Sequence, residues 1–320
     1  MTLLGHEDAW NQWRAAMAGP RMHHGWLLAG KRGLGKTMFG LAAARELVAE
    51  PGVTQPKGDH PDILLLSHPP KDEKEAKKRD EGKPFELKRN IPVDLIRAMQ
   101  QRLATRPTLG SRRVVIIDPA DDMEKGAANA LLKSLEEPPQ GTFFLLVAHQ
   151  PARLLPTIRS RCRVLRFSGL PDDTINRWLA EAAPDADVAT RKAAVAAAAG
   201  SPGAALAFVG QELGKVDVPI RRILSQGDPD FSLRGQLAGE IGGRPSRERV
   251  QAILELARAV VADEAGRTEG RRLAALIEAH SQLVTLAGQV PVYNFDPGLL
   301  AMEIGTLLAN AATASERADV

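Results

Sequence analysis

Short apolar runs alternate with amphipathic stretches through the first half of the chain. Runs of four to six mostly apolar residues, bounded by polar or turn-forming positions, predict β-strands. These runs lie at residues 26–29, 63–66, 114–117, 143–148 and 164–167. Between them the apolar positions recur at helical spacing, at residues 7–17, 38–48, 91–103 and 125–137. The alternation predicts an α/β domain whose parallel sheet is covered by helices on both faces.

After residue 167 the strand-like runs stop and the spacing of apolar positions becomes helical to the end. Helices are expected over 171–182, 189–199, 203–210, 246–265, 270–288 and from 296 to about 312. Ser246 and Asp296 are suited to cap two of these helices, because their side-chain oxygens can accept from free N–H groups of the first turn. We therefore divide the chain into three domains, 1–168, 169–212 and 213–320.

Residues 30–37 read G-x-x-x-x-G-K-T, the pattern of a phosphate-binding P-loop, between an expected strand and an expected helix. Gly30, Gly33 and Gly35 would let backbone N–H groups converge on a phosphate at a helix N-terminus. Lys36 would reach the β- and γ-phosphates, and the Thr37 hydroxyl would bind Mg²⁺. The expected cofactor is ATP or ADP with Mg²⁺. The alternative is an ordinary glycine turn between a strand and a helix.

A carboxylate directly follows the expected strand 114–117. In P-loop enzymes an aspartate in the place of Asp118 holds Mg²⁺ beside the phosphates, although a strand that merely ends in Asp is common. Pro119 stands where an ATPase that works alone would place a glutamate to orient the attacking water. Asp121 and Asp122 lie further along the chain, and we expect them to point elsewhere.

Composition and charge narrow the class of protein. Of the 320 residues 44% are apolar and only 4% aromatic, so aliphatic cores are expected. No apolar stretch approaches the roughly 18 residues of a membrane helix, and no basic-then-apolar leader opens the chain. A soluble, cytoplasmic protein without membrane partners is therefore expected.

The excess of Lys and Arg over Asp and Glu, 42 against 39, is too small to argue nucleic-acid binding. The dense mixed charges of 71–80 predict an exposed insertion between 69 and 90.

Cys162 is the only cysteine in the sequence, and a single cysteine excludes internal disulfides and a cysteine-rich zinc site. Five arginines lie close to it in the sequence. They occupy positions 153, 159, 161, 163 and 166. Arg161, expected between a helix end and a strand, could reach the γ-phosphate held by a neighbouring subunit as an arginine finger. Spacing alone leaves a solvated basic rim equally open. Cys162 is expected to be a small buried side chain rather than a nucleophile.

Five segments together carry a resemblance to a known family. They read MHHGWLLAG at 22–30, IPVDLIR at 91–97, ANALLKSLEEPP at 128–139, LLPTIRSRC at 154–162 and GSPGAA at 200–205. In order and spacing they resemble the delta-prime subunits of the bacterial DNA polymerase III clamp loader, over roughly residues 5–210. The last third is similar only in its helical character and length.

The resemblance implies an AAA+ P-loop domain of three layers with a parallel sheet, a small helical lid and an all-helical C-terminal collar. The collar would join other clamp-loader subunits in a hetero-pentameric ring that loads the sliding clamp on primed DNA. Arg161 would act in trans on ATP held by an adjacent motor subunit. Lys133 and the arginine-rich segment are candidates for direct DNA contact.

Several departures from the pattern of related subunits bear on mechanism. Pro119 replaces their glutamate, and the segment 200–203 lacks the arginine that would sense the γ-phosphate. Residues 50–61 lack the four cysteines of the zinc module that many relatives carry, so no zinc is expected. The loop 148–151 is one residue short, and no sensor residue is assigned there.

The resulting hypothesis is a subunit that binds nucleotide but hydrolyses it poorly. The alternatives are a self-contained P-loop ATPase or kinase, and a scaffold whose P-loop is vestigial.

Overall fold

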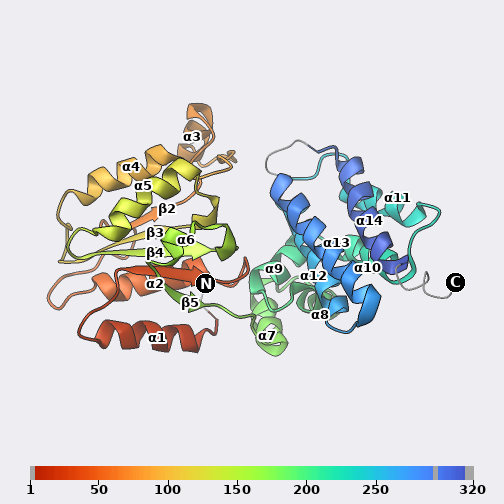
Figure 1. Ribbon diagram of the computed structural model, residues 1–320, viewed down its shortest axis with the longest axis horizontal. Coiled ribbons are helices and arrows are strands. Elements are labelled where there is room, and N and C mark those ends of the chain that lie inside the picture. Colours follow the sequence, from red (N-terminus) through yellow and green to blue (C-terminus); the bar gives the residue numbers. More distant parts are fainter. Residues whose placement is uncertain (1–3, 291–294, 314–320) are drawn as a thin grey trace. The chain divides into compact units, whose positions relative to one another are not determined.

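The structure is a computed structural model that describes residues 4–290 and 295–313. The chain forms two compact units, residues 1–168 and 169–320. The first unit holds the sheet, and the second consists of helices (Figure 1). The further division between a lid and a collar at residue 212 stays a prediction.

The first unit is built on a five-stranded sheet in which every neighbouring pair of strands is parallel. In spatial order the strands are β2 (Ile63–Leu66), β3 (Arg113–Ile117), β4 (Thr142–Ala148), β1 (Gly25–Ala29) and β5 (Arg163–Arg166). Each lies within a residue of its predicted run. The prediction succeeds because strands buried on both faces read as continuous apolar runs, and every residue of β1 and β3 is buried.

Helices cover both faces of this sheet and make it the middle of three layers (Figure 1). On one face lie α1 (Glu7–Ala18) and α2 (Lys36–Val48); on the other lie α4 (Val93–Leu103), α5 (Lys125–Glu136) and α6 (Pro156–Arg159). Successive residues of a strand point to opposite faces. Leu145 of β4 therefore packs with α1 and α2, while Leu146 packs with α4 and α5. The expected α/β architecture is confirmed.

The charged insertion between residues 69 and 90 has a helix of its own and one buried carboxylate. It contains α3 (Glu73–Asp80), and Pro70 pairs with Leu87 in an antiparallel bridge that closes its base. The Glu75 side chain is buried, accepting from the Lys78 ammonium over 2.7 Å and from the backbone N–H of Glu86 over 2.7 Å. The expected exposed insertion is confirmed, since among residues 71–90 only Glu75 is buried and only residues 76 and 78 are partly exposed.

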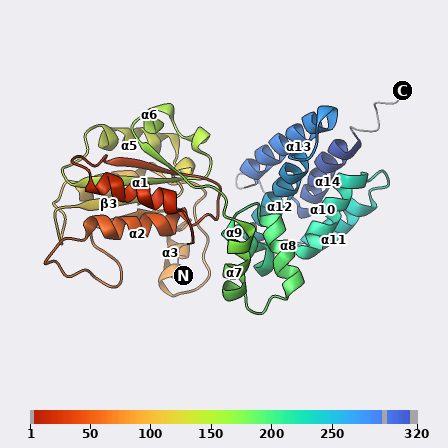
Figure 2. The same ribbon diagram turned by 90° about the horizontal axis from the view of Figure 1, so that it is seen from below.

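The second unit packs its helices around one continuous aliphatic core that runs from Ile175 to Ala311. Its helices are α7 (Asp172–Ala182), α8 (Val188–Ala198), α9 (Pro202–Gly210), α10 (Gly214–Gln226), α11 (Ser232–Ile241), α12 (Arg247–Ala265), α13 (Gly270–Gln289) and α14 (Pro297–Thr313). Within this unit α12 packs on α13, and α14 contacts α10, α11 and α13 (Figure 2). Both predicted caps are confirmed: Ser246 accepts from Arg249 N–H over 3.1 Å, and Asp296 from Leu299 N–H over 3.0 Å. None of the helices in the described part of the chain has the length and apolarity that crossing a bilayer requires.

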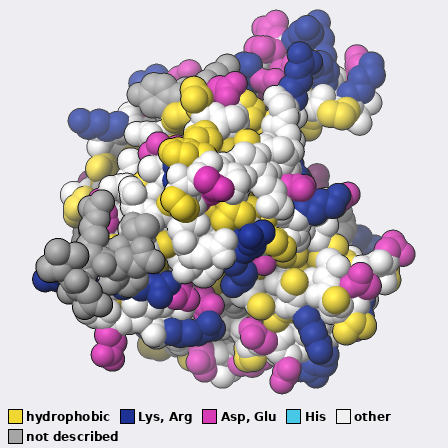
Figure 3. All heavy atoms as spheres, turned by 90° about the vertical axis from the view of Figure 1, so that its right-hand side faces the viewer, with side chains coloured by type: hydrophobic (Ala, Val, Ile, Leu, Met, Phe, Trp, Pro, Cys, Tyr) yellow, Lys and Arg dark blue, Asp and Glu magenta, His cyan; other side chains and the backbone are white. Residues whose placement is uncertain are grey.

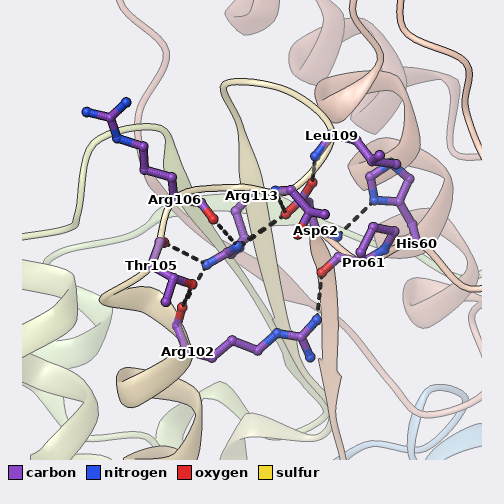
Figure 4. A network of polar contacts seen from close by, with 9 residues as sticks. His60, Pro61, Asp62, Arg102, Thr105, Arg106, Leu109 and Arg113 are labelled. Carbon is purple, nitrogen blue, oxygen red and sulfur yellow. Dashed lines mark hydrogen bonds and ion pairs between the residues drawn. The ribbon is translucent and has the colours of Figure 1, made fainter.

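A buried ion pair fixes the amino-terminal edge of the sheet, where β2 and β3 begin (Figure 4). The guanidinium of Arg113 meets the carboxylate of Asp62 at 3.2 Å, and both side chains are nearly inaccessible to solvent. Asp62 also accepts from the N–H groups of Thr108 and Leu109, at 2.7 and 2.8 Å. Arg113 donates its remaining hydrogens to the carbonyls of Arg102, Thr105 and Arg106. Because every group is paired, this edge tolerates two buried charges.

Candidate nucleotide site

The segment between β1 and α2 has the backbone that a P-loop requires. Gly33 and Gly35 both adopt φ of +78°, a conformation that L side chains rarely take. At Gly30 a Cβ atom would lie only 2.4 Å from the carbonyl oxygen of Phe167. Gly30 therefore cannot carry a side chain without displacing the backbone that follows β5. These glycines keep the loop narrow where α2 begins, so that free N–H groups of the helix face the loop.

Lys36, the first residue of α2, is almost completely buried beneath this loop. Its ammonium donates to the carbonyl oxygens of Gly30 and Lys31, at 2.7 and 2.6 Å. Burial lowers the pKa of Lys36 to about 8, against the opposing effect of the Asp118 and Asp121 carboxylates. The ammonium of Lys36 is thus a buried cation at the loop, and a polyanionic phosphate would compensate its burial.

Thr37 and Asp118 come together although they belong to different elements. The Thr37 hydroxyl, in the first turn of α2, donates to Asp118 Oδ2 over 2.6 Å. Asp118 follows β3, and its N–H donates to the carbonyl of Leu66 at the end of β2. A hydroxyl and a carboxylate at this distance are the hard oxygen ligands that Mg²⁺ prefers. The donor set therefore fits a nucleotide-bound Mg²⁺, alongside the glycine loop and Lys36.

Two further residues, Asp121 and His149, join the same edge of the sheet and were missed from sequence. Asp121, in the 3₁₀ turn η1 (Ala120–Asp122), is buried and accepts from the N–H groups of His149 and Gln150 after β4. Burial, together with the positive charge of Lys36, lowers the pKa of His149 to about 4. His149 Nδ1 is buried without a hydrogen-bond partner in the described part of the chain. A neutral imidazole with a free nitrogen therefore lies near the P-loop lysine.

These contacts refine the expectation that Asp121 and Asp122 point elsewhere. Both Asp121 oxygens are engaged by backbone N–H groups of the loop after β4. Asp122 turns to His68 Nε2, at 3.3 Å, and to the Arg153 guanidinium, at 3.6 Å. Neither carboxylate substitutes for the glutamate that Pro119 replaces. The contact between Asp121 and His149 has no sequence signal, because 28 residues separate the two positions.

Arg161 lies at the opposite edge of the sheet from the P-loop. It precedes β5 by two residues, and β5 begins beside Trp26, near the start of β1, whereas the P-loop follows the end of β1. The five residues of β1 rise about 3.3 Å each, so roughly 13–16 Å separate the two ends. Arg161 is about one-third exposed and forms an ion pair with Glu136 at 2.7 Å. An arginine there cannot contact the nucleotide site of its own chain.

The sequence profile of a family described as "DNA polymerase III, delta subunit" matches residues 5–171, more than half of the chain. The chain belongs to this family. The DNA polymerase III subunit delta' of Pseudomonas aeruginosa is 35% identical over 216 residues, which are 63% of this chain and 60% of that protein. The corresponding subunit of Escherichia coli is 33% identical over 204 residues, 59% of this chain and 55% of that protein.

Among solved structures, a DNA polymerase III gamma subunit-related protein from Thermotoga maritima is similar to this chain. It is 19% identical and has a TM-score of 0.47, and the alignment covers 95% of this chain and 99% of that one.

The family match confirms the expected resemblance to delta-prime subunits and covers the first unit from residue 5 onward, P-loop and Arg161 included. The expected fold class, a three-layer α/β domain with a parallel sheet followed by helices, is confirmed as well. The chain spans only 55–60% of the length of the two curated delta-prime relatives named above. The family assignment therefore rests mainly on the first unit, to which all the candidate site residues belong.

Proposed function

We propose that this chain is a non-motor subunit of the cytoplasmic DNA polymerase III clamp loader. It joins other clamp-loader subunits in a hetero-pentameric ring that loads the sliding clamp on primed DNA. In this ring it binds nucleotide but hydrolyses it poorly, and Arg161 serves as an arginine finger for ATP held by a neighbouring subunit. The single observation that carries the proposal is the position of Arg161 at the edge of the sheet opposite the P-loop of its own chain.

The finger assignment rests on reach and exposure. The segment that carries Arg161 and the P-loop lie at opposite ends of β1, roughly 13–16 Å apart along the strand, so the Arg161 guanidinium is useful to phosphate chemistry only if another subunit presents a nucleotide to it. Arg161 is accessible at the surface, and its backbone is anchored between α6 and β5 by a hydrogen bond to Ile158. Positive charge brought to a γ-phosphate in this way stabilises the charge of the transition state.

The nucleotide assignment rests on the residues gathered after β1 and β3. The glycine loop and Lys36 would hold the phosphates, and Thr37 with Asp118 would hold Mg²⁺. Bound there with nucleotide, Mg²⁺ would supply positive charge shared between the β- and γ-phosphates. Pro119 offers no carboxylate to orient water, and the oxygens of Asp121 are engaged by backbone N–H groups. Poor hydrolysis by the isolated chain is expected because neither position offers a free carboxylate to orient the attacking water.

The second unit supports a role in assembly. It leaves several large hydrophobic side chains exposed to solvent: Val188, Val218, Phe231, Ile277, Phe295 and Leu299. Seen from the side of this unit, hydrophobic side chains lie on the surface between acidic and basic ones (Figure 3). Exposed apolar surface with a charged surround is typical of protein–protein contacts. We assign this helical unit to the lid and the collar of the ring.

The first experiment tests the finger in the assembled complex. Clamp loader reconstituted with the Arg161→Ala chain should assemble normally and lose a large part of its DNA-stimulated ATPase activity, since arginine fingers are worth about 10³–10⁵ in rate at the site they serve. Arg14→Ala is the matched control, an exposed arginine of α1 that also forms an ion pair with a glutamate, Glu46. An Arg161→Ala complex with the ATPase rate of the wild type would remove the finger assignment.

The second experiment tests the nucleotide site in the isolated chain. A fluorescent ATP analogue with Mg²⁺ is titrated against the wild-type chain and Lys36→Ala, and phosphate release is followed in parallel. Binding that disappears in the variant, with negligible release, is the expected result. Release at about 1 s⁻¹ or faster, an ordinary enzyme rate, would instead favour the self-contained ATPase. Absence of binding would make the P-loop vestigial.

A further inference from the structure

The side chain of Glu136 forms the ion pair that holds Arg161 at the molecular surface. We infer that Glu136 is a positioning residue for Arg161, orienting its guanidinium toward the phosphate of the neighbouring subunit. This inference rests on the proposed function of Arg161. It adds a second residue to the finger, one that touches neither nucleotide nor metal.

The geometry fixes one side of the guanidinium and leaves the other side available. Nη2 of Arg161 lies 2.7 Å from Oε1 of Glu136, and Nη1 donates to the backbone carbonyl of Thr157 over 2.9 Å. A guanidinium carries five N–H donors in a rigid planar fork. Two contacts leave further N–H groups to meet an anion. The carboxylate and the carbonyl together set the plane and direction of that fork.

Both partners are attached to rigid backbone near the start of β1. Glu136 is the last residue of α5, and the preceding carbonyl, that of Leu135, is 2.8 Å from His24 Nε2. On the other side, a Cβ atom at Gly25 would lie 2.9 Å from the carbonyl oxygen of Arg161. The end of α5 and the segment before β5 are therefore packed against two consecutive residues, His24 and Gly25. An ion pair between two fixed backbones restricts the Arg161 side chain more than one between flexible loops.

The exposure of the pair argues that its effect is on orientation rather than on folding. The side chains of Glu136 and Arg161 are 49% and 35% exposed. Exposed ion pairs contribute little to the free energy of folding. An arginine left free at a surface samples many rotamers, and that freedom is lost when it engages a phosphate. Glu136 restricts these rotamers in advance, so that the finger is already ordered when a neighbouring nucleotide arrives.

The same contact allows the opposite interpretation, that Glu136 restrains Arg161. The two interpretations predict changes of opposite sign in the ATPase rate when the Glu136 carboxylate is removed. If Glu136 instead withheld Arg161 from the phosphate, removing the carboxylate would raise the ATPase rate of the complex. If Glu136 orients the finger, removing it lowers kcat and leaves KM for ATP nearly unchanged, because the lost contact serves the transition state.

The test uses clamp loader reconstituted with the full-length chain in the forms Glu136→Ala, Glu136→Gln and Glu137→Gln. Glu137 is the matched control: it is the next residue and carries the same carboxylate, and its side chain has no ion pair within the described residues. We expect Glu136→Ala to lower the DNA-stimulated kcat by about tenfold, the scale of one lost charge-assisted contact. Glu136→Gln, which still accepts a hydrogen bond, should recover part of this loss. Glu137→Gln should match the wild type.

A double-mutant comparison shows whether Glu136 acts through Arg161. In the Arg161→Ala background, Glu136→Ala should have no further effect, since the group it orients is gone. The melting temperatures of the isolated Glu136 variants should equal that of the wild type. An unchanged or raised kcat for Glu136→Ala, or a loss of equal size without Arg161, would overturn the positioning role.

The failures of the two proposals are distinguishable. If Arg161→Ala lowers the ATPase rate of the complex and Glu136→Ala does not, only the positioning role is wrong. If Arg161→Ala itself leaves the rate unchanged, the finger assignment fails and the role of Glu136 fails with it.

Discussion

The hydroxyl of Thr37 donates to the carboxylate of Asp118 over 2.6 Å, across 81 residues of sequence. The contact joins the first turn of α2 to the end of β3, so the two oxygen donors lie side by side. Because α2 begins directly at the P-loop, a cation held by this pair would lie beside the phosphates. The arrangement explains why the motif at 30–37 and the strand at 114–117 belong to one site.

Asp118→Asn should weaken nucleotide binding in the presence of Mg²⁺ by at least about tenfold, since the variant loses the anionic oxygen that favours the cation. In EDTA the variant and the wild type should bind equally, because the glycine loop is unchanged. Fluorescence titration with and without Mg²⁺ measures both affinities. Asp122→Asn is the control, since its carboxylate pairs with His68 and Arg153 instead. Equal Mg²⁺-dependent affinity of the Asp118 variant and the wild type would contradict the assignment.

Nucleotide affinity should fall as the pH rises through about 8, because burial lowers the pKa of Lys36 to about 8. Bound phosphates favour the charged ammonium, so binding takes up a proton in alkaline solution. The dissociation constant of ADP should therefore increase by up to about tenfold per pH unit above this pKa.

The lowered pKa of Lys36 has the opposite effect on the stability of the fold, which should increase with pH. Between about pH 8 and the ordinary lysine pKa the unfolded chain binds more protons, so stability rises with pH there.

Lys36→Arg supplies the control for this pH profile. Its guanidinium stays protonated throughout the range, so its affinity, whatever its absolute value, should not follow the wild-type slope. A wild-type profile as flat as that of the arginine variant would show that Lys36 does not change charge on binding.

Much of the fold could be predicted from sequence because its signals are local. The strands of a sheet covered on both faces appear as continuous apolar runs, as at 114–117, and the P-loop glycines occur within eight residues of one another. Ser246 and Asp296 were recognised as caps because a cap bonds an N–H only three residues away.

The rest of the candidate site could not be predicted because its contacts are made by the tertiary fold. Asp121 and His149 meet only because β3 and β4 are neighbours in the sheet. The ion pair between Glu136 and Arg161 depends on how α5 ends beside the connection to β5. The burial of Glu75 within a run of charges is likewise invisible in composition. Periodicity finds elements, but it does not find which polar side chains those elements bring together.

Removing one partner of the buried ion pair at the amino-terminal edge of the sheet should destabilise the protein. Asp62→Ala leaves the Arg113 guanidinium buried and uncompensated, and we expect a loss of about 3–5 kcal/mol in the free energy of unfolding. Urea denaturation measures this loss. The exposed pair of Arg14 and Glu46 provides the comparison, and Glu46→Ala should have little effect. Similar losses in the two variants would show that burial does not determine how much the Asp62–Arg113 pair contributes to the free energy of unfolding.

Cys162 should be nearly inert toward thiol reagents in the folded chain. Burial raises the pKa of its thiol to about 12, so the reactive thiolate is scarce at pH 8. Because the chain has no other cysteine, the reaction with an aromatic disulfide reports this site alone. We expect the folded chain to react on the order of a thousandfold more slowly than the chain unfolded in guanidinium chloride. Comparable rates in the two states would contradict the burial of the thiol.

Gly25→Ala should change both the reactivity of the Cys162 thiol and the position of Arg161. The added Cβ would lie 2.9 Å from the Arg161 carbonyl oxygen and 3.3 Å from Cys162 Sγ, and Gly25 is held in the middle of the sheet. The segment before β5 must therefore move outward, since β1 is hydrogen-bonded on both sides. Faster thiol modification and a lower ATPase rate of the reconstituted complex should appear together. Gly40→Ala is the control, since its Cβ would meet only side-chain atoms at ordinary distances, 3.4 Å or more. A Gly25→Ala chain with unchanged thiol reactivity would show that the backbone around Arg161 is not packed against β1 as described.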